Sequence, residues 1–492
     1  MAQSVPAAAA TAVRRRTYLR WCLTVLGVLL FLAGYSSAFL RDWPVKVWTT
    51  MFAPSARRLM AGEVLYRHTD VDMYVYPPSI AMQSIPLALL PPFAGVIAWY
   101  LVSAAALGVT VWCAWHLAGL RGWSRQNAMI LMGALVLGGR FLLSPLENHQ
   151  FDAVIAAMLM LGFVALQRRQ ESQSAMWLGT AASMKCTPWL IGPYLWGRGQ
   201  RMAAVVFALT AICWNVVPDL VFPRTPQVSH LEDWHREVLD RASHTAPGQW
   251  IHGGQAQPLN QSLGGLVHRA SMLGVSWFPN SPIAARLNEP GSRRWLGLGL
   301  SAVLVGACWW SLRRKNSMPA QAGSFPSLHL PTSEEPRQRM EKGAQATHAR
   351  QGFRGEQSLP VNVPEPRVGL EASMVLCLML LFSPQSSKSH YVVMILPMLV
   401  LVHAAWQTQS WRLRGVLGGL LLLGPLSVKD VLGLKWGYAA LIAGVPTWFV
   451  LLSLAGLWQA ARLSVSWQPS DVLEVRGDVP RQEESVPLRR AA

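Results

Sequence analysis

Residues 127–166 read NAMILMGALVLGGRFLLSPLENHQFDAVIAAMLMLGFVAL, a polar cluster set between two apolar runs. The runs are Asn127–Pro145 and Ala153–Leu166, and the cluster between them is Asn148–Asp152. Apolar runs of this kind are typical of helices that cross a bilayer, which need about 20 residues. Polar groups at the end of such helices are costly and usually functional. We therefore expect two membrane helices joined by a functional turn.

The composition of the whole chain is that of a membrane protein. Of its 492 residues, 52% are hydrophobic and only 14% are charged, whereas soluble proteins carry about 25% charged residues. The net charge of +18 is attributed to basic loops and tails, because no basic helix or aromatic-interleaved patch suggests nucleic-acid binding. All six cysteines lie in apolar runs without metal-ligand spacing and are interpreted as packing residues. We expect an all-α polytopic membrane protein.

Basic residues set the expected orientation of the chain in the membrane. Arg14–Arg16 place residues 1–16 in the cytoplasm, and Thr17–Leu40 is expected as a retained signal-anchor helix. Residues 41–76 and 223–294 are then external loops of a membrane domain that covers residues 17–312. The other expected spans are Phe93–Leu117, Asn127–Pro145, Ala153–Leu166, Met202–Phe222, Trp295–Leu312, Glu371–Phe382, Tyr391–Trp406, Val416–Val428 and Trp436–Ala460.

The apolar segment Ala175–Trp196 departs from this alternation. Arg168 precedes the segment and Arg198 follows it, so both ends are basic. Lys185 and Pro188 lie in its middle. A straight span would put one basic end outside, and proline breaks helices, so we expect a re-entrant hairpin that is broken at these two central residues. The expected bundle has about ten transmembrane helices plus this hairpin.

The C-terminal part of the chain divides into three regions. Residues 313–367 are rich in Pro, Ser, Gln, Gly and charge, and we expect them to form a disordered cytoplasmic insert. Residues 368–460 are expected to hold the C-terminal transmembrane helices, and residues 461–492 a cytoplasmic tail.

On this layout, four polar clusters face outward. Each alone has an ordinary explanation, such as a helix cap, an interfacial carboxylate or a rigid entry into the next helix. Their coincidence on one face indicates a functional site. The clusters are Arg41–Pro44 with Arg57, Arg58 and Tyr76–Pro78; Asn148–Asp152; Asn260–Leu263; and Ser383–Tyr391.

The residue types in these clusters limit the possible chemistry. The sequence has no glycine-rich phosphate loop and no His, Cys and carboxylate set with metal spacing, so neither a cofactor nor a metal is expected. A Ser-His-Asp hydrolase lacks a nucleophile-elbow frame. One carboxylate with cations and a histidine nearby suits a base that deprotonates a hydroxyl while the cations hold a phosphate leaving group. That is the chemistry of sugar transfer from a lipid-phosphate donor.

Seven motifs follow one another in an order that is typical of one family. They are Ala56–Tyr66, Tyr76–Pro78, Pro86–Pro91, Asn148–Asp152, Lys185–Pro188, Asn260–Leu263 and Ser383–Tyr391. Together they resemble glycosyltransferase family 87, a branch of the membrane-embedded GT-C class that includes polyprenyl-phosphate-mannose-dependent mannosyltransferases. The resemblance implies a GT-C-type bundle, a polyprenyl-monophosphate sugar donor, a lipid or glycan hydroxyl acceptor, and inversion at the sugar carbon. It also implies an active site on the periplasmic (external) face of a bacterial inner (plasma) membrane.

The resemblance further implies roles for individual residues. The family has an aspartate base in the first external loop, for which Asp42 is the nearest candidate and Asp70 and Asp72 are alternatives. His390 matches an outer-face histidine of the family and is expected to be catalytic together with Asp42. The expected substrate-binding residues are Arg57, Arg58, Tyr76, Asn148, Gln150, Asp152, Lys185, Asn260, Gln261, Ser262 and Lys388.

Two other functions remain open at this point. A transporter or lipid flippase would need polar residues that line a path to both faces, whereas here they cluster outside except for Lys185 and Arg140. A lipid-linked oligosaccharide polymerase or ligase would share the outer-face site but would use a diphosphate-linked donor. Competition between monophosphate and diphosphate lipids would separate this enzyme from a monophosphate-dependent transferase.

Overall fold

The computed structural model describes Gly27 and residues 47–70, 73–224, 228–241, 259–313, 367–426 and 429–463. Within these ranges the regular secondary structure is helical throughout. The expected first helix Thr17–Leu40, the two aspartates Asp42 and Asp72, and residues 464–492 lie outside the described residues, as does all but the edges of the 313–367 insert. The expectation of an all-α membrane protein is confirmed.

Four of the described helices are long and apolar enough to cross a membrane. They are α4 (Pro92–Leu117), α5 (Arg125–Glu147), α9 (Arg201–Val221) and the continuous segment Lys388–Thr408, which joins η5 (Lys388–Met394) to α16 (Ile395–Thr408). The part Leu432–Ile442 of α18 (Lys429–Ile442) and α19 (Val445–Arg462) pass the same test only together, with a bend of 61° between them, so the number of spans is five if this bent pair counts as one. The count of about ten spans therefore stays a prediction.

Residues 127–166, with the polar cluster between two apolar runs, form two helices and a turn. Ser124 begins α5, because its side chain accepts a hydrogen bond from the backbone N–H of Asn127 at 3.1 Å. His149 has a φ of 52°, in the left-handed region, and the chain reverses there before α6 (Asp152–Gln167) begins. The indole Nε1 of Trp99 donates to the carbonyl of His149 at 3.1 Å, which anchors the reversed turn to α4.

Small residues bring the central helices close together. α7 (Glu171–Met184) packs on both α6 and α9. A side chain on Gly162 would overlap Leu178, and one on Gly179 would overlap the backbone of Phe207. Such close approach is how membrane helices gain packing energy in the absence of a hydrophobic drive between them. The three helices therefore form a tightly packed core of the bundle.

The chain turns back directly after α7, at the position that the sequence predicts. Lys185 is extended, with φ −154° and ψ 142°, and Pro188 lies in the first turn of η2 (Thr187–Leu190), which leads into α8 (Ile191–Gly197). At the tip, Lys185 pairs with Asp152, whereas at the far end Arg198 pairs with Glu371 in the first turn of α15 (Val368–Phe382). The depth of this reversal within a bilayer stays a prediction.

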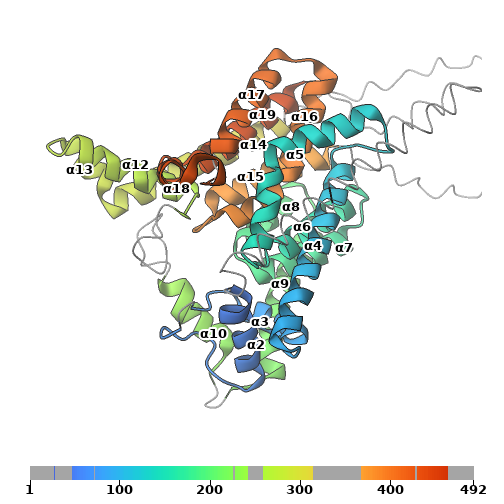
Figure 1. Ribbon diagram of the computed structural model, residues 1–492, viewed down its shortest axis with the longest axis vertical. Coiled ribbons are helices and arrows are strands. Elements are labelled where there is room, and N and C mark those ends of the chain that lie inside the picture. The colour runs from blue at the N-terminus through green and yellow to red at the C-terminus, as the bar shows by residue number, and fades with distance from the viewer. Residues whose placement is uncertain are drawn as a thin grey trace, which may run out of the picture.

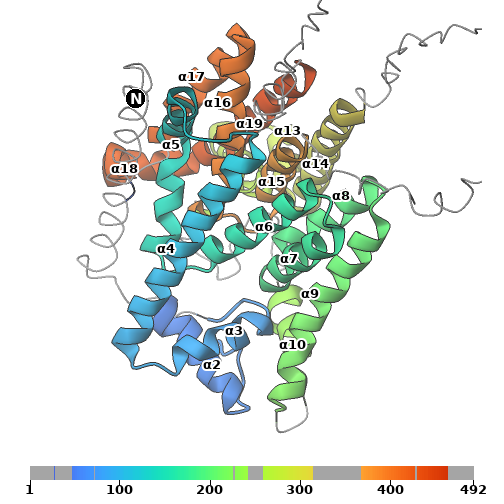
Figure 2. The same cartoon turned by 90° about the vertical axis from the view of Figure 1, so that its right-hand side faces the viewer.

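Short elements from distant parts of the sequence cap one end of the bundle. In both views α2 (Ala53–Met60), α3 (Pro78–Ala88) and α10 (His230–Trp234) lie together beyond the ends of α4 and α9 (Figures 1 and 2). α2 and α10 come from the two segments that the sequence assigns to external loops, residues 41–76 and 223–294, and α3 directly follows the first of them. The remaining helices are η1 (Trp48–Phe52), η3 (His235–Asp240), α12 (Leu263–Trp277), α13 (Pro282–Asn288), α14 (Pro290–Arg313) and α17 (Trp411–Leu426).

Candidate active site

A cavity of about 740 Å³ lies at the capped end of the bundle. Its walls come from six separate stretches of the chain: the segment of η1, the loop before α3, the turn before α6, the reversal after α7, the segment of α10 and η3, and the loop that leads into η5. The side chains that the argument uses are those of Tyr76, Gln150, Lys185, Glu237, Ser387 and His390. Four of these residues were predicted from the sequence to bind substrate or to catalyse.

A buried ion pair fixes the lysine of this cavity. The Nζ atom of Lys185 lies 2.7 Å from Oδ1 of Asp152, whose residue is only 4% exposed. The same Nζ lies 5.6 Å from the centre of the Tyr76 ring, within reach of a cation–π contact. The second carboxylate oxygen, Oδ2, is buried and has no hydrogen-bond partner in the described part of the chain. The arrangement therefore holds one ammonium group at the cavity wall.

His390 is oriented by the turn that precedes it. The backbone N–H of Ser387 donates to Nδ1 of His390 at 3.0 Å, and the Ser387 hydroxyl lies 2.9 Å from the same nitrogen. A ring nitrogen that accepts from an N–H leaves the other nitrogen, Nε2, protonated in the neutral imidazole. No hydrogen bond to Nε2 occurs within the described residues, so His390 offers an N–H donor to a ligand of the cavity.

Aromatic side chains pack around Tyr76, which lines the cavity beside the ion pair. The Tyr76 ring packs on Phe52 at 5.2 Å between centroids, and Phe52 packs on Phe151 at 4.7 Å. The Tyr66 hydroxyl donates to the backbone carbonyl of Tyr76 at 3.1 Å, which holds this loop in place. Burial, and then the nearby Asp152, raise the pKa of Tyr76 well above its usual value. Tyr76 is therefore a neutral aromatic platform and not a base.

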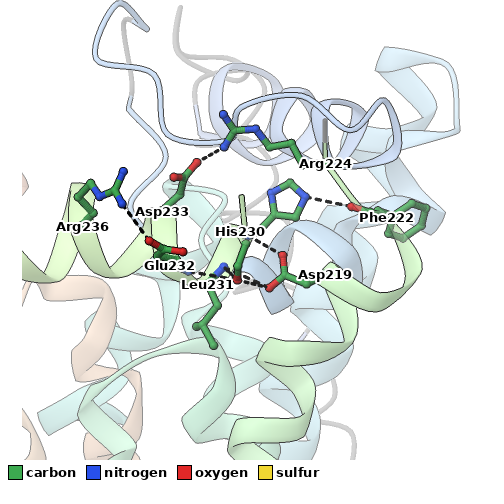
Figure 3. A network of polar contacts seen from close by, with 9 residues as sticks. Asp219, Phe222, Arg224, His230, Leu231, Glu232, Asp233 and Arg236 are labelled. Atoms are coloured by element: carbon green, nitrogen blue, oxygen red, sulfur yellow. Dashed lines mark hydrogen bonds and ion pairs between the residues drawn. The ribbon is translucent and has the colours of Figure 1, made fainter. Parts of the chain in front are cut away.

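A polar network attaches the last wall of the cavity to the end of α9 (Figure 3). Asp219 of α9 accepts hydrogen bonds from the Ser229 hydroxyl at 2.6 Å and from the backbone N–H groups of His230 and Leu231. Its carboxylate thus caps the start of α10, where negative charge is favourable. Trp234 at the end of α10 donates from Nε1 to the carbonyl of Val75 at 3.2 Å. The network therefore connects the cavity's two capping segments.

The helix η3, which follows α10, adds a carboxylate to the cavity. Glu237 lies 2.6 Å from Nε2 of His68 and 3.0 Å from a guanidinium nitrogen of Arg241. Hydrogen bonding from His68 is the main reason why the pKa of Glu237 is lowered. Glu237 is thus an ionised, paired carboxylate at the cavity wall.

Several predicted residues lie beside the cavity and hold its parts together. The three residues Asn260, Gln261 and Ser262 are buried, with 0%, 0% and 1% exposure. Asn260 donates from Nδ2 to the carbonyl of Pro384 at 2.9 Å and accepts from the backbone N–H of Ser386 at 3.2 Å. They therefore support the loop that carries His390 and do not line the cavity.

The other predicted residues also make contacts within the protein. Asn148 donates from Nδ2 to the carbonyl of Ser144 at 2.8 Å, and Arg57 donates to the carbonyl of Ala88 at 3.4 Å. Arg58 pairs with Asp70, which lines the cavity. Lys388 is the first residue of η5. A role for these side chains in substrate binding stays a prediction.

Sequence reasoning missed the whole wall built from α10 and η3. The sequence predicts a single loop over residues 223–294, so it gives Trp234 and Glu237 no role, nor their partner His68 in the first external loop. One local signal was present, because Ser229 and Glu232 stand at the spacing of a capping box, and Ser229 does cap α10. No group of three His, Cys, Asp or Glu side chains close enough to hold a metal ion occurs in the described ranges.

Comparison with known families assigns the class of this protein. The family model of glycosyltransferase family 87 matches residues 74–327, just over half of the 492 residues. The chain therefore belongs to glycosyltransferase family 87, and it is a transferase with apolar helices that can cross a membrane. Searches of curated proteins and of solved structures gave no significant match. The matched residues include Tyr76, Lys185 and Asn260–Ser262, and they end before the loop that carries His390.

Proposed function

We propose that this protein transfers a hexose, with mannose as the first choice, from a polyprenyl-monophosphate sugar to a hydroxyl of a lipid or glycan acceptor. The observation that carries the proposal is the convergence of Lys185 and His390 on one cavity in a protein of family 87. A phosphate group needs positive charge and N–H donors, and these two side chains supply one of each. The reaction inverts the configuration at the sugar carbon.

The two side chains act on the leaving group. As the bond from the sugar to the phosphate breaks, negative charge grows on the phosphate oxygens, and a preorganised cation stabilises it more than it stabilises the intact donor. Lys185 is preorganised by Asp152 and by the Tyr76 ring. His390 is preorganised by the hydrogen bond from Ser387 to its Nδ1.

Asp42 acts as the base that deprotonates the acceptor hydroxyl. It lies outside the described residues, but Val47, five positions later, lines the cavity. Five residues of extended chain span at most about 18 Å, so the connection to Val47 allows the carboxylate to reach the cavity. Asp70 lines the cavity too and is the alternative, although its pairing with Arg58 makes it a poorer base.

The cavity end of the bundle faces the outside of a bacterial inner membrane in this proposal. Arg168 and Arg169 lie in the turn between α6 and α7, at the end away from Asp152 and Lys185. Since basic loops stay in the cytoplasm, the cavity end is then external. The full GT-C-type bundle of about ten helices, with the segment after α7 as a re-entrant hairpin, belongs to the same proposal.

The first test is sugar transfer in membranes that contain this protein, with radiolabelled polyprenyl-monophosphate mannose as donor. We expect a labelled product with wild type and a loss of about 100-fold or more with Asp42→Asn, which removes the base. Equal transfer by wild type and Asp42→Asn would indicate that the base is Asp70 or Asp72 instead. Full transfer after both Asp42→Asn and His390→Ala would overturn the proposed site. Competition by a diphosphate-linked donor in place of the monophosphate would identify a polymerase or ligase instead.

A further inference from the structure

A second cavity lies away from the candidate active site. It has a volume of about 620 Å³ and is enclosed by α12, α13, α14 and α19. Its lining is almost entirely apolar, with Leu266, Val267, Leu296, Leu300 and Leu451 as typical members. α12 and α13 project from the main bundle in Figure 1. We call this cavity the α12–α14 groove.

The surface around the α12–α14 groove is suited to a membrane. Trp277 and Phe278 at the end of α12, Ile283 of α13 and Trp295 of α14 are each more than 60% exposed. Large apolar side chains that are exposed together mark a surface that contacts lipid or another apolar partner. Tryptophan is also enriched at the level of lipid head groups. These exposed side chains favour contact of the groove's rim with lipid.

Three basic side chains are buried beside this groove. Arg269, Arg293 and His268 are 6%, 6% and 3% exposed. Arg269 donates from Nε to the carbonyl of Ile442 at 3.0 Å and from Nη1 to the carbonyl of Asn260. Its Nη2 is buried without a hydrogen-bond partner in the described part.

Arg293, like Arg269, is a buried cation with a hydrogen-bond donor that has no described partner. Arg293 contacts Nδ1 of His268 through Nη1, and its Nε is buried without a described partner. Neither Arg269 nor Arg293 forms an ion pair with a carboxylate among the described residues. Burial, then Arg293 and Arg269, lower the pKa of His268. Buried cations without a counter-ion are costly, so an anion bound beside these two arginines would be stabilising.

His268, Arg269 and Arg293 do not line the α12–α14 groove themselves but lie next to its lining residues along α12 and α14. Arg293 precedes Leu296 and Leu300 by three and seven residues on α14, so the three lie on one face of the helix. On α12, His268 and Arg269 directly follow the groove residue Val267. Charge beside an apolar lining matches a molecule with an anionic head and long tails.

We infer that the α12–α14 groove binds an anionic membrane glycerophospholipid, with its phosphate between Arg269 and Arg293 and its acyl chains along the groove. Guanidinium groups bind phosphate through paired N–H donors, and both arginines have such donors unused. None of the three basic residues lines the cavity of Lys185 and His390. The lipid site is thus separate from the proposed donor site, and it does not depend on the proposed reaction.

The test measures lipid retained by the full-length protein after purification in detergent, by native mass spectrometry. The probes are phosphatidylglycerol and phosphatidylcholine with identical acyl chains, without any sugar donor. We expect wild type to retain phosphatidylglycerol in preference to phosphatidylcholine. In Arg293→Gln, the amount of retained phosphatidylglycerol should fall about tenfold or more, because a charged hydrogen-bond donor is lost. Arg294→Gln is the matched control, because Arg294 is the next residue and is exposed.

A second variant tests the groove without changing charge or fold. Gly274 lines the groove, and a side chain added there meets nothing within 4 Å, so Gly274→Leu should fold normally and occupy the space for the tails. Lower retention in Gly274→Leu supports the inference. Wild-type retention in both variants overturns it, as does equal retention of the two lipids or a preference for polyprenyl phosphate. Displacement by inorganic phosphate with normal retention in Gly274→Leu would show a free-anion site instead. None of these readings uses sugar transfer, so failure here leaves the proposed function untouched.

Discussion

At the scale of single residues, the contact between Asp152 and Lys185 is the most informative in the protein. In the sequence, both residues are polar positions next to or within apolar stretches. The sequence does not show that they form an ion pair, because 33 positions separate them. Only the antiparallel packing of α6 and α7 brings the start of one helix to the end of the other. The pair also explains why a lysine is tolerated in the middle of an apolar segment, since a buried ammonium needs a counter-ion.

A double-variant experiment separates the structural from the functional role of this pair. Lys185→Met leaves a buried carboxylate without its partner and should destabilise the protein by about 3–5 kcal/mol. The double variant Asp152→Asn/Lys185→Met removes both charges and should recover most of that loss. Sugar transfer should stay low in the double variant, because the cation for the phosphate is still missing. The measurements are thermal unfolding in detergent and the transfer assay; recovered transfer in the double variant would contradict the role of Lys185.

At the scale of elements, the sequence predicts the helices that have long hydrophobic runs. It does not predict the short helices, whose stability depends on packing. The expected spans Phe93–Leu117 and Asn127–Pro145 lie within α4 and α5, and the break predicted at Lys185 and Pro188 is present. By contrast, α10, η3, α12 and α13 all lie in residues 223–294, where we expected a loop. Their stability comes from contacts such as those of Asp219 with the start of α10, which depend on residues distant in sequence.

The hydrogen bonds of Asp219 should hold α10 and η3, which form one wall of the cavity, in place. Asp219→Ala removes the acceptor for the first backbone N–H groups of α10, and loss of a cap costs about 1 kcal/mol. We expect faster hydrogen exchange in residues 228–241 and about a tenfold fall in kcat/KM for sugar transfer. Glu232→Ala is the control, because Glu232 lies on the same helix and pairs only with Arg236 on the surface. Equal exchange rates in the two variants would show that the network does not hold the wall.

At the scale of the whole molecule, the candidate site is assembled from both halves of the chain. Tyr76, Gln150 and Lys185 precede the segment 314–366, and Ser387 and His390 follow it. The sequence suggested part of this assembly, because it placed the motifs of Tyr76, Gln150 and His390 on one face of the membrane, with Lys185 as an exception. It could not show the depth or the walls of the cavity, which depend on how the two capping segments fold over the bundle (Figure 2).

The orientation of the whole molecule can be tested at Cys186, which lies beside Lys185 and lines the cavity. A charged, membrane-impermeant thiol reagent should modify Cys186 from the outside of intact spheroplasts, and Cys186→Ala should abolish this modification. Polyprenyl phosphate should protect the thiol if it occupies the cavity. Cys213 is an internal control, because it is exposed on the spanning helix α9, where a charged reagent cannot reach it through lipid. Modification only in inverted vesicles would reverse the proposed orientation.

The reversal after α7 has a consequence for how the nascent chain is inserted into the membrane. The ribosome makes Asp152 33 residues before Lys185, so α6 is available before the tip that carries the lysine is pushed toward the far side. Moving a lone lysine to the centre of a bilayer costs about 2.5–3.5 kcal/mol on insertion scales. In the proposed re-entrant arrangement, the Asp152 carboxylate at the start of α6 is made first and would offset that cost as the tip arrives. The order of the two residues along the chain would then also be the order of their insertion, with Asp152 as the counter-ion for Lys185.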